Sequence, residues 1–160
     1  MRRQSLIGLL VVAGVVLGSG CSRTTAGTRA SADRDVVLSV SSAPGLGRFV
    51  AVDGWTVYMY PPDQQRSVTC TQVGDCRQAW PPLLVPAGHR VIAGPGVRAG
   101  LIGTMRADGG NVVTYNHWPL YYYIGDRKAG QTNGQDQGFN WFVIRPTGNP
   151  NKTDMGSPTG

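Results

Sequence analysis

The chain contains the same residue pattern twice, and this duplication constrains its fold more than any other feature. The stretches WTVYMYPPD and WPLYYYIGD, which begin at Trp55 and Trp118, share the order Trp, two residues, Tyr, one residue, Tyr, two residues, Asp. Their matching positions are 63 residues apart throughout. Self-similarity at one constant offset of this size indicates two copies of a single small structural unit.

Both copies have the apolar runs and turn signals of short β-strands. Tight two-residue turns are expected at Asp53-Gly54 in the first copy and at Asn116-His117 in the second, because such pairs adopt positive φ readily. Between the turn signals lie runs of strand length. The expected strands cover residues 35–40, 48–52 and 55–60 in the first copy, and 101–107, 111–115 and 118–124 in the second.

The composition argues against long helices. The chain has no glutamate, and it contains 23 glycines and 11 prolines, which are the two residues least favourable in a helix interior. We therefore predict an all-β fold in which two tandem pseudo-repeats, each of three to four short antiparallel strands, form one small domain. The sequence leaves open whether that domain is a sandwich or barrel-like.

The N-terminus has the pattern of an export signal. Arg2 and Arg3 precede an uncharged apolar run over residues 6–17, which is shorter than the roughly 20 residues of a membrane-spanning helix. Small residues then lead into Cys21, as in a bacterial lipobox. We predict a signal peptide over 1–20 and a lipidated Cys21 that anchors the chain to the outer face of the cell membrane. A plain secretory signal cut nearby is the alternative.

The remaining sequence divides into a linker, a domain and a tail. Residues 21–34 are small and polar, which is typical of a flexible linker. The duplicated domain is expected over 35–145, with the first repeat at about 35–85 and the second at about 98–145. Residues 146–160 are poor in apolar side chains, so a disordered tail is expected there.

The two remaining cysteines, Cys70 and Cys76, are six positions apart. Two nearby thiols in an oxidising compartment indicate a structural disulfide. A redox-active or metal-binding thiol pair is the alternative, although the spacing matches neither C-x-x-C nor a zinc knuckle. We predict a disulfide and no metal site.

Charge and motifs give no indication of nucleic-acid binding or catalysis. The net charge is +6, but the basic residues are scattered rather than clustered on one element, so no nucleic-acid partner is expected. No catalytic motif is present, and His89 and His117 fall in expected loops and turns. Asp63 and Asp126 could form a glycosidase-like pair, but nothing nearby indicates a raised pKa. We predict no catalytic residues and no cofactor.

The period of a β-strand separates the aromatic residues of the motif onto two faces. In the first copy the face with Trp55, Val57 and Met59 is the expected core face. The tyrosines lie opposite, where another layer, a loop or a ligand must cover them. The candidate ligand-binding or structural motif consists of Tyr58, Tyr60, Asp63, Tyr121, Tyr123 and Asp126. It can pack and cap turns, or it can form a platform for a sugar ring or a cation.

The repeated Tyr-x-Tyr-x-x-Asp motif, the cysteine pair before AWPPLL and the GQTNGQ segment together resemble a known family. It is the family of secreted bacterial lipoprotein repeats of unknown function, described by a Tyr-x-(Phe/Trp/Tyr)-x-x-Asp motif. The resemblance covers about residues 46–145, and it places the family's cysteine-to-tryptophan element on Cys70, Cys76, Trp80, Pro81 and Pro82. It implies an extracytoplasmic lipoprotein and implies no activity.

Together these features predict a membrane-anchored lipoprotein of the bacterial cell envelope that acts as a non-catalytic binding or structural module. Its expected partners are the membrane, through the lipid on Cys21, and a cell-envelope glycan or protein. The alternative is an accessory protein for extracytoplasmic redox, haem or metal handling.

Overall fold

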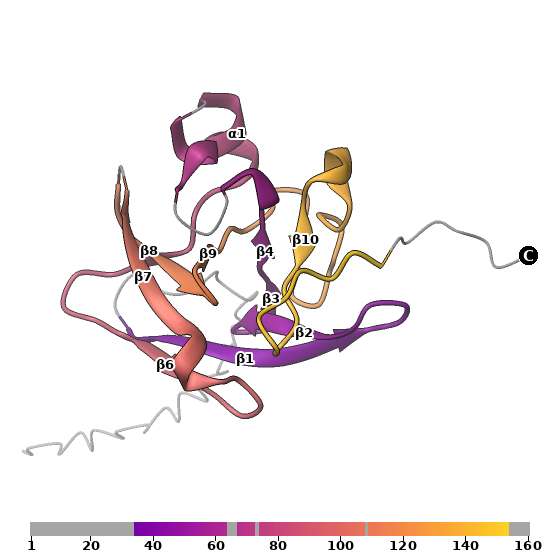
Figure 1. Ribbon diagram of the computed structural model, residues 1–160, viewed down its shortest axis with the longest axis horizontal. Helices are drawn as coiled ribbons and strands as arrows, with labels where there is room; N and C mark the ends of the chain where they lie inside the picture. The colour runs from indigo at the N-terminus through magenta and orange to yellow at the C-terminus, as the bar shows by residue number, and fades with distance from the viewer. Residues whose placement is uncertain (1–33, 64–66, 73, 108, 154–160) are drawn as a thin grey trace, which may run out of the picture.

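The computed structural model of the chain describes residues 34–63, 67–72, 74–107 and 109–153 (Figure 1). The predicted signal peptide, Cys21 and nearly all of the predicted linker lie outside the described residues. Within the described part, no helix combines the length and apolar character needed to cross a membrane.

The first repeat contributes most of one sheet. Strands β1 (Val36–Ala43), β2 (Gly47–Val52) and β3 (Trp55–Thr56) form an antiparallel meander, and β6 (Val91–Ala93) pairs with β1 in parallel. The turn between β2 and β3 has positive φ at both Asp53 and Gly54, as predicted.

The second repeat builds an equivalent sheet. Strands β7 (Ile102–Ala107), β8 (Gly110–Tyr115) and β9 (Trp118–Pro119) form a second meander. Strand β5 (Leu84–Val85) pairs with β8 on the edge opposite β7, which it shares with β9. The β8–β9 turn again has two residues of positive φ, Asn116 and His117, which confirms the second predicted hairpin.

The two repeats meet at the tyrosine motif. The backbone of Tyr58 and that of Tyr121 exchange two hydrogen bonds, with N···O distances of 2.8 and 2.9 Å. A third, two-stranded sheet beside this contact pairs β4 (Tyr58–Met59) with β10 (Phe142–Val143). The strand orders do not close on themselves. The predicted all-β domain of two repeats is therefore confirmed, and its sheets are open.

Short helical segments interrupt the strands, and the sequence pattern did not predict them. The α-helix α1 (Gly74–Ala79) follows Cys70, contains Cys76 and projects above the sheets in Figure 1. Within the described residues there are also four 3₁₀ helices, at Pro61–Asp63, Thr69–Gln72, Ala99–Leu101 and Gln137–Phe139.

Each repeat gives its last strand to the other repeat. We call these strands the closing strands, residues 81–85 of the first repeat and 142–144 of the second. The first closing strand pairs with the second repeat: Leu83 accepts a hydrogen bond from Val113 N at 2.8 Å and donates one to Leu120 O at 2.8 Å. It does not return to its own meander.

The second closing strand makes the reciprocal exchange. Ile144 O accepts a hydrogen bond from Val50 N at 2.9 Å, and Phe142 pairs with Met59. Val50 and Val113 are equivalent positions of the two copies, so the two exchanges are related by the same internal symmetry. The repeats therefore form one interlocked unit.

Two apolar cores lie on opposite faces of the motif strands. The first core includes Val57, Met59, Leu120 and Tyr122, with the partly buried Trp118 packed against it. It therefore confirms the predicted core face. The second core covers the tyrosine face and includes Leu46, Phe49, Tyr58, Val68, Cys70, Trp80, Val112, Tyr121, Trp141 and Val143. The layer that covers the motif tyrosines is thus protein.

The predicted disulfide is confirmed. The Cys70 and Cys76 sulfur atoms are 2.07 Å apart and the Cα atoms 5.3 Å apart. Cys70 is buried in the second core. The bridge therefore ties helix α1 to the interior.

The folded part of the chain extends beyond the limit predicted at residue 145. Residues 146–153 are described, and Ile144 pairs with Pro150. Asn151 is fully buried, and its Nδ2 donates to Leu46 O at 2.6 Å. A segment with few apolar residues is held here by hydrogen bonds to one buried amide, which hydrophobic patterning does not detect.

Candidate functional site: the interlocked tyrosine and aspartate motifs

The two motifs are joined crosswise by hydrogen bonds between side chains. The Tyr58 hydroxyl donates to Asp126 Oδ2 at 2.7 Å, and the Tyr121 hydroxyl donates to Asp63 Oδ2 at 2.6 Å. All four residues are buried: the two tyrosines and Asp63 are 0% exposed and Asp126 is 3% exposed. Each aspartate is therefore bound to the tyrosine of the other motif rather than to that of its own.

The second oxygen of each carboxylate holds the loop that follows it. Asp63 Oδ1 accepts hydrogen bonds from Thr69 N at 2.8 Å and from Thr69 Oγ1 at 2.5 Å. Asp126 Oδ1 accepts from Asn133 N at 2.9 Å. These contacts correspond to the turn-capping role considered from the sequence. The bond to the opposite tyrosine is an additional role that the sequence did not reveal.

Four aromatic rings stack in a row beside these hydrogen bonds, and we call this row the aromatic column. Its order is Tyr60, Trp141, Trp80 and Tyr123, with centroid separations of 4.5, 3.8 and 4.3 Å between successive rings. Each outer tyrosine stacks on the tryptophan of the other repeat. The two inner rings are almost parallel, with an interplanar angle of 3°.

The buried tyrosines contact the column through ring edges. Tyr58 meets Trp80 at a centroid distance of 5.5 Å and Tyr121 meets Trp141 at 5.2 Å, both in T-shaped geometry. Edge-to-face and offset-stacked pairs are the favoured aromatic arrangements. Because each tryptophan directly precedes a closing strand, the strand exchange itself brings each tryptophan to the opposite motif.

A glycine in the second repeat permits the close packing. Gly134 N donates to the Tyr58 hydroxyl at 3.2 Å. A Cβ at this position would lie 2.7 Å from Tyr58 Cζ and 2.9 Å from Trp80 Cη2, which is closer than side-chain contacts allow. Neither Gly134 nor the two tryptophans was predicted as a site residue. The recurrence of a tryptophan near the end of each repeat, at Trp80 and Trp141, is the sequence signal that could have identified them.

Little of the motif reaches solvent. Trp80 and Trp141 are each 6% exposed, whereas Tyr60 and Tyr123 at the ends of the column are partly exposed. The inner aromatic faces are therefore occupied by the protein's own rings. The interpretation as a ligand platform stays a prediction, and it is restricted to the outer sides of Tyr60 and Tyr123.

The environment of the two buried hydroxyls favours their neutral form. Burial is the main cause that raises the pKa of Tyr58 well above its ordinary value, and the negative charge of Asp126 adds to it. Burial likewise raises the pKa of Tyr121, followed by the hydrogen bond to Asp63. Both hydroxyls thus remain hydrogen-bond donors under conditions in which exposed tyrosines ionise.

The raised pKa values predict loss of stability at alkaline pH. Above about pH 10 the unfolded chain releases these two phenolic protons while the folded chain retains them. Each tyrosine then lowers the free energy of unfolding by about 1.4 kcal/mol per pH unit. Urea unfolding between pH 9 and 11 should show this decline. In the Tyr58→Phe/Tyr121→Phe variant the free energy of unfolding should fall less steeply with pH, by a slope that corresponds to about two protons. An unchanged slope in that variant would contradict the assignment.

The other sequence candidates lie apart from this cluster. His89 Nδ1 is 3.4 Å from Asp35 Oδ1 at the surface, and His117 is exposed in the β8–β9 turn. Among the described residues, no group of three histidine, cysteine or acidic side chains has the arrangement of a metal site.

One protein-family model matches both repeats of the chain. A family model described as a secreted repeat of unknown function matches residues 46–84 and 104–145. Each matched segment contains one tyrosine–aspartate motif and the tryptophan that crosses to the other repeat. Comparisons with curated proteins and with solved structures gave no significant match.

Proposed function

Because the chain belongs to the family of secreted repeats of unknown function, and is therefore extracytoplasmic, we propose that it is a non-catalytic, lipid-anchored module of the bacterial cell envelope. Cys21 is the proposed site of lipid attachment, and residues 21–34 are the proposed linker between the membrane and the folded domain. Two or more acyl chains on one cysteine give stable anchoring without a membrane-spanning segment.

The crosswise hydrogen bonds between the motifs are the observation that carries the non-catalytic assignment. A general acid or base must reach a substrate proton within hydrogen-bond distance. The Asp63 and Asp126 carboxylates are instead buried, and they bind the tyrosine hydroxyls and the loops that follow them. The motif thus supports a structural role, in which it locks two repeats into a rigid unit that presents its outer surface to a glycan or protein of the envelope.

Replacement of the proposed lipid site tests the anchor. In a bacterial host that processes lipoproteins, the wild-type chain should partition into the detergent phase, and the Cys21→Ser variant should move to the aqueous phase or the medium. Mass spectrometry of the wild-type N-terminus should show a diacylglyceryl group on Cys21. The Cys70→Ser/Cys76→Ser variant is the matched control and should stay anchored. Membrane retention of Cys21→Ser, or an unmodified wild-type cysteine, would overturn the proposal.

The same preparation tests the alternative role in redox, haem or metal handling. The binding-module proposal expects a colourless protein with no bound metal and no reactive thiol on Cys70 or Cys76. A visible absorption band or stoichiometric metal in the purified protein would replace the proposal with that alternative.

A further inference from the structure

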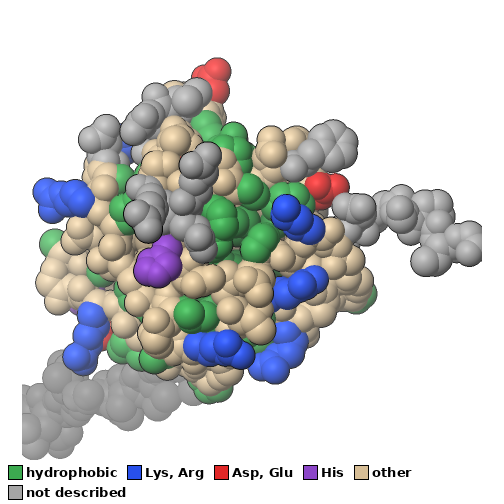
Figure 2. Space-filling view, in the orientation of Figure 1, with side chains coloured by type: hydrophobic (Ala, Val, Ile, Leu, Met, Phe, Trp, Pro, Cys, Tyr) green, Lys and Arg blue, Asp and Glu red, His purple; other side chains and the backbone are tan. Residues whose placement is uncertain are grey.

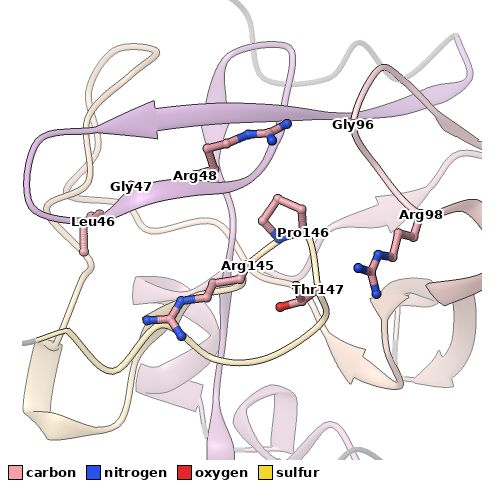
Figure 3. Close-up of a pocket in the computed structure, with 8 residues that line it drawn as sticks. All are labelled: Leu46, Gly47, Arg48, Gly96, Arg98, Arg145, Pro146 and Thr147. Carbon is pink, nitrogen blue, oxygen red and sulfur yellow. The ribbon is translucent and has the colours of Figure 1, made fainter.

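Three arginines from distant parts of the chain line one surface pocket (Figure 3). We call it the arginine pocket. Arg48 lies on β2, Arg98 precedes the 3₁₀ helix at Ala99–Leu101, and Arg145 follows β10. The pocket encloses about 530 Å³, and Pro146 and Thr147 form part of its wall. Successive arginines are 50 and 47 positions apart, so they form no basic cluster in the sequence.

One buried hydroxyl fixes two walls of the arginine pocket. Tyr115 is fully buried, and its hydroxyl accepts a hydrogen bond from Arg98 N at 3.0 Å. The same hydroxyl donates to Pro146 O at 2.8 Å. The loop that carries Arg98 is therefore tied to the segment that carries Arg145.

A buried amide fixes the remaining wall. Asn151 donates to Leu46 O at 2.6 Å, and its Oδ1 accepts from Arg145 Nη2 at 2.8 Å. This contact uses one of the five donors of the Arg145 guanidinium and leaves others available. Because buried polar side chains connect all three segments, the pocket is formed in advance of any ligand, as small-molecule sites usually are.

The charge of the arginine pocket is not balanced within the described part of the chain. None of the described acidic residues lines it, and the recorded ion pairs join other partners, Arg34 with Asp53 and Arg90 with Asp35. Figure 2 shows Lys and Arg side chains gathered on the lower right of that view. Three arginines in its wall give the pocket a positive potential that concentrates anions.

We propose that the arginine pocket binds a phosphate-bearing ligand. The planar guanidinium fork matches the geometry of phosphate oxygens, and charge-assisted hydrogen bonds of this type are among the strongest in proteins. The volume exceeds that of a phosphate ion alone, which leaves room for an attached glycerol or sugar beside Leu46, Pro146 and Thr147. The proposal is independent of the lipid on Cys21, so the anchoring test and this test can fail separately.

Titration with glycerol 3-phosphate tests the proposal on the Cys21→Ser protein, which retains every residue of the pocket. The Arg48→Gln/Arg98→Gln variant is the informative one, because no described hydrogen bond or ion pair of either side chain holds the fold. Calorimetry should show one site whose affinity falls at least about tenfold in this variant, as expected for loss of two charge-assisted bonds. The Arg106→Gln/Arg127→Gln control removes the same charge from exposed arginines elsewhere and should bind as the parent does.

The choice of probe separates the possible sources of the phosphate group. Inorganic phosphate should bind more weakly than glycerol 3-phosphate if the neutral wall contributes. Binding to phosphatidylglycerol vesicles, with none to phosphatidylcholine vesicles or to the soluble ester, would identify a lipid headgroup as the source. Equal losses in the pocket variant and the control would show non-specific attraction and overturn the proposal, as would no binding to any probe.

Discussion

Replacement of Trp141 by alanine is expected to remove about 3–5 kcal/mol from the free energy of unfolding, the usual cost of deleting a large buried aromatic side chain. Trp141 stacks between Trp80 and Tyr60 and receives the edge of Tyr121, so its loss opens a cavity where the repeats meet. Small domains have a total stability of about 5–15 kcal/mol. Urea unfolding should therefore show a variant that unfolds at a clearly lower urea concentration than the wild type.

Two further variants make this measurement specific to the aromatic column. Trp80→Ala should cost a similar amount, and the double variant should cost less than the sum because the two rings contact each other at 3.8 Å. Ile124→Ala is the matched control, because this side chain is 44% exposed and its truncation should change stability by no more than about 0.5 kcal/mol. Strict additivity of the tryptophan variants would show that the column does not act as a unit.

Replacement of Asp63 by alanine should destabilise the domain by about 3 kcal/mol or more. The variant leaves the Tyr121 hydroxyl, Thr69 N and Thr69 Oγ1 without their acceptor. A buried donor that loses its partner costs about 1–3 kcal/mol. Chemical unfolding at neutral pH measures the loss.

A double-mutant cycle identifies which tyrosine is bonded to Asp63. The cycle of Tyr121→Phe with Asp63→Asn joins residues of different motifs and should give a coupling energy of about 0.5–3 kcal/mol. The cycle of Tyr58→Phe with Asp63→Asn joins residues of the same motif and should give a smaller value. A larger coupling within the same motif would contradict the crosswise arrangement.

The sequence predicted the parts of the fold that local rules determine. Asp53-Gly54 and Asn116-His117 mark the hairpins because a two-residue turn needs positive φ at both positions. The alternation of side chains correctly assigned Val57 and Met59 to the first core. Proximity in sequence and an oxidising compartment were enough to indicate the disulfide.

The sequence could not predict which copy a closing strand joins. Leu83 and Ile144 have the same apolar character and equivalent surroundings, so pairing within a repeat and pairing across repeats give the same pattern. The crosswise bonds of Asp63 and Asp126 follow from that exchange and were hidden with it. The arginine pocket was also hidden, because Arg48 and Arg145 line one pocket only after the sheets assemble.

The exchange of closing strands means that neither half of the gene product is a folding unit by itself. If the second repeat were deleted, β2 and β4 would lose Ile144 and β10 and would expose unpaired backbone N–H and C=O groups. Exposed strand edges of this kind promote association with other chains and aggregation. Proteolysis or truncation between the repeats would therefore leave two fragments that must bind each other to be stable.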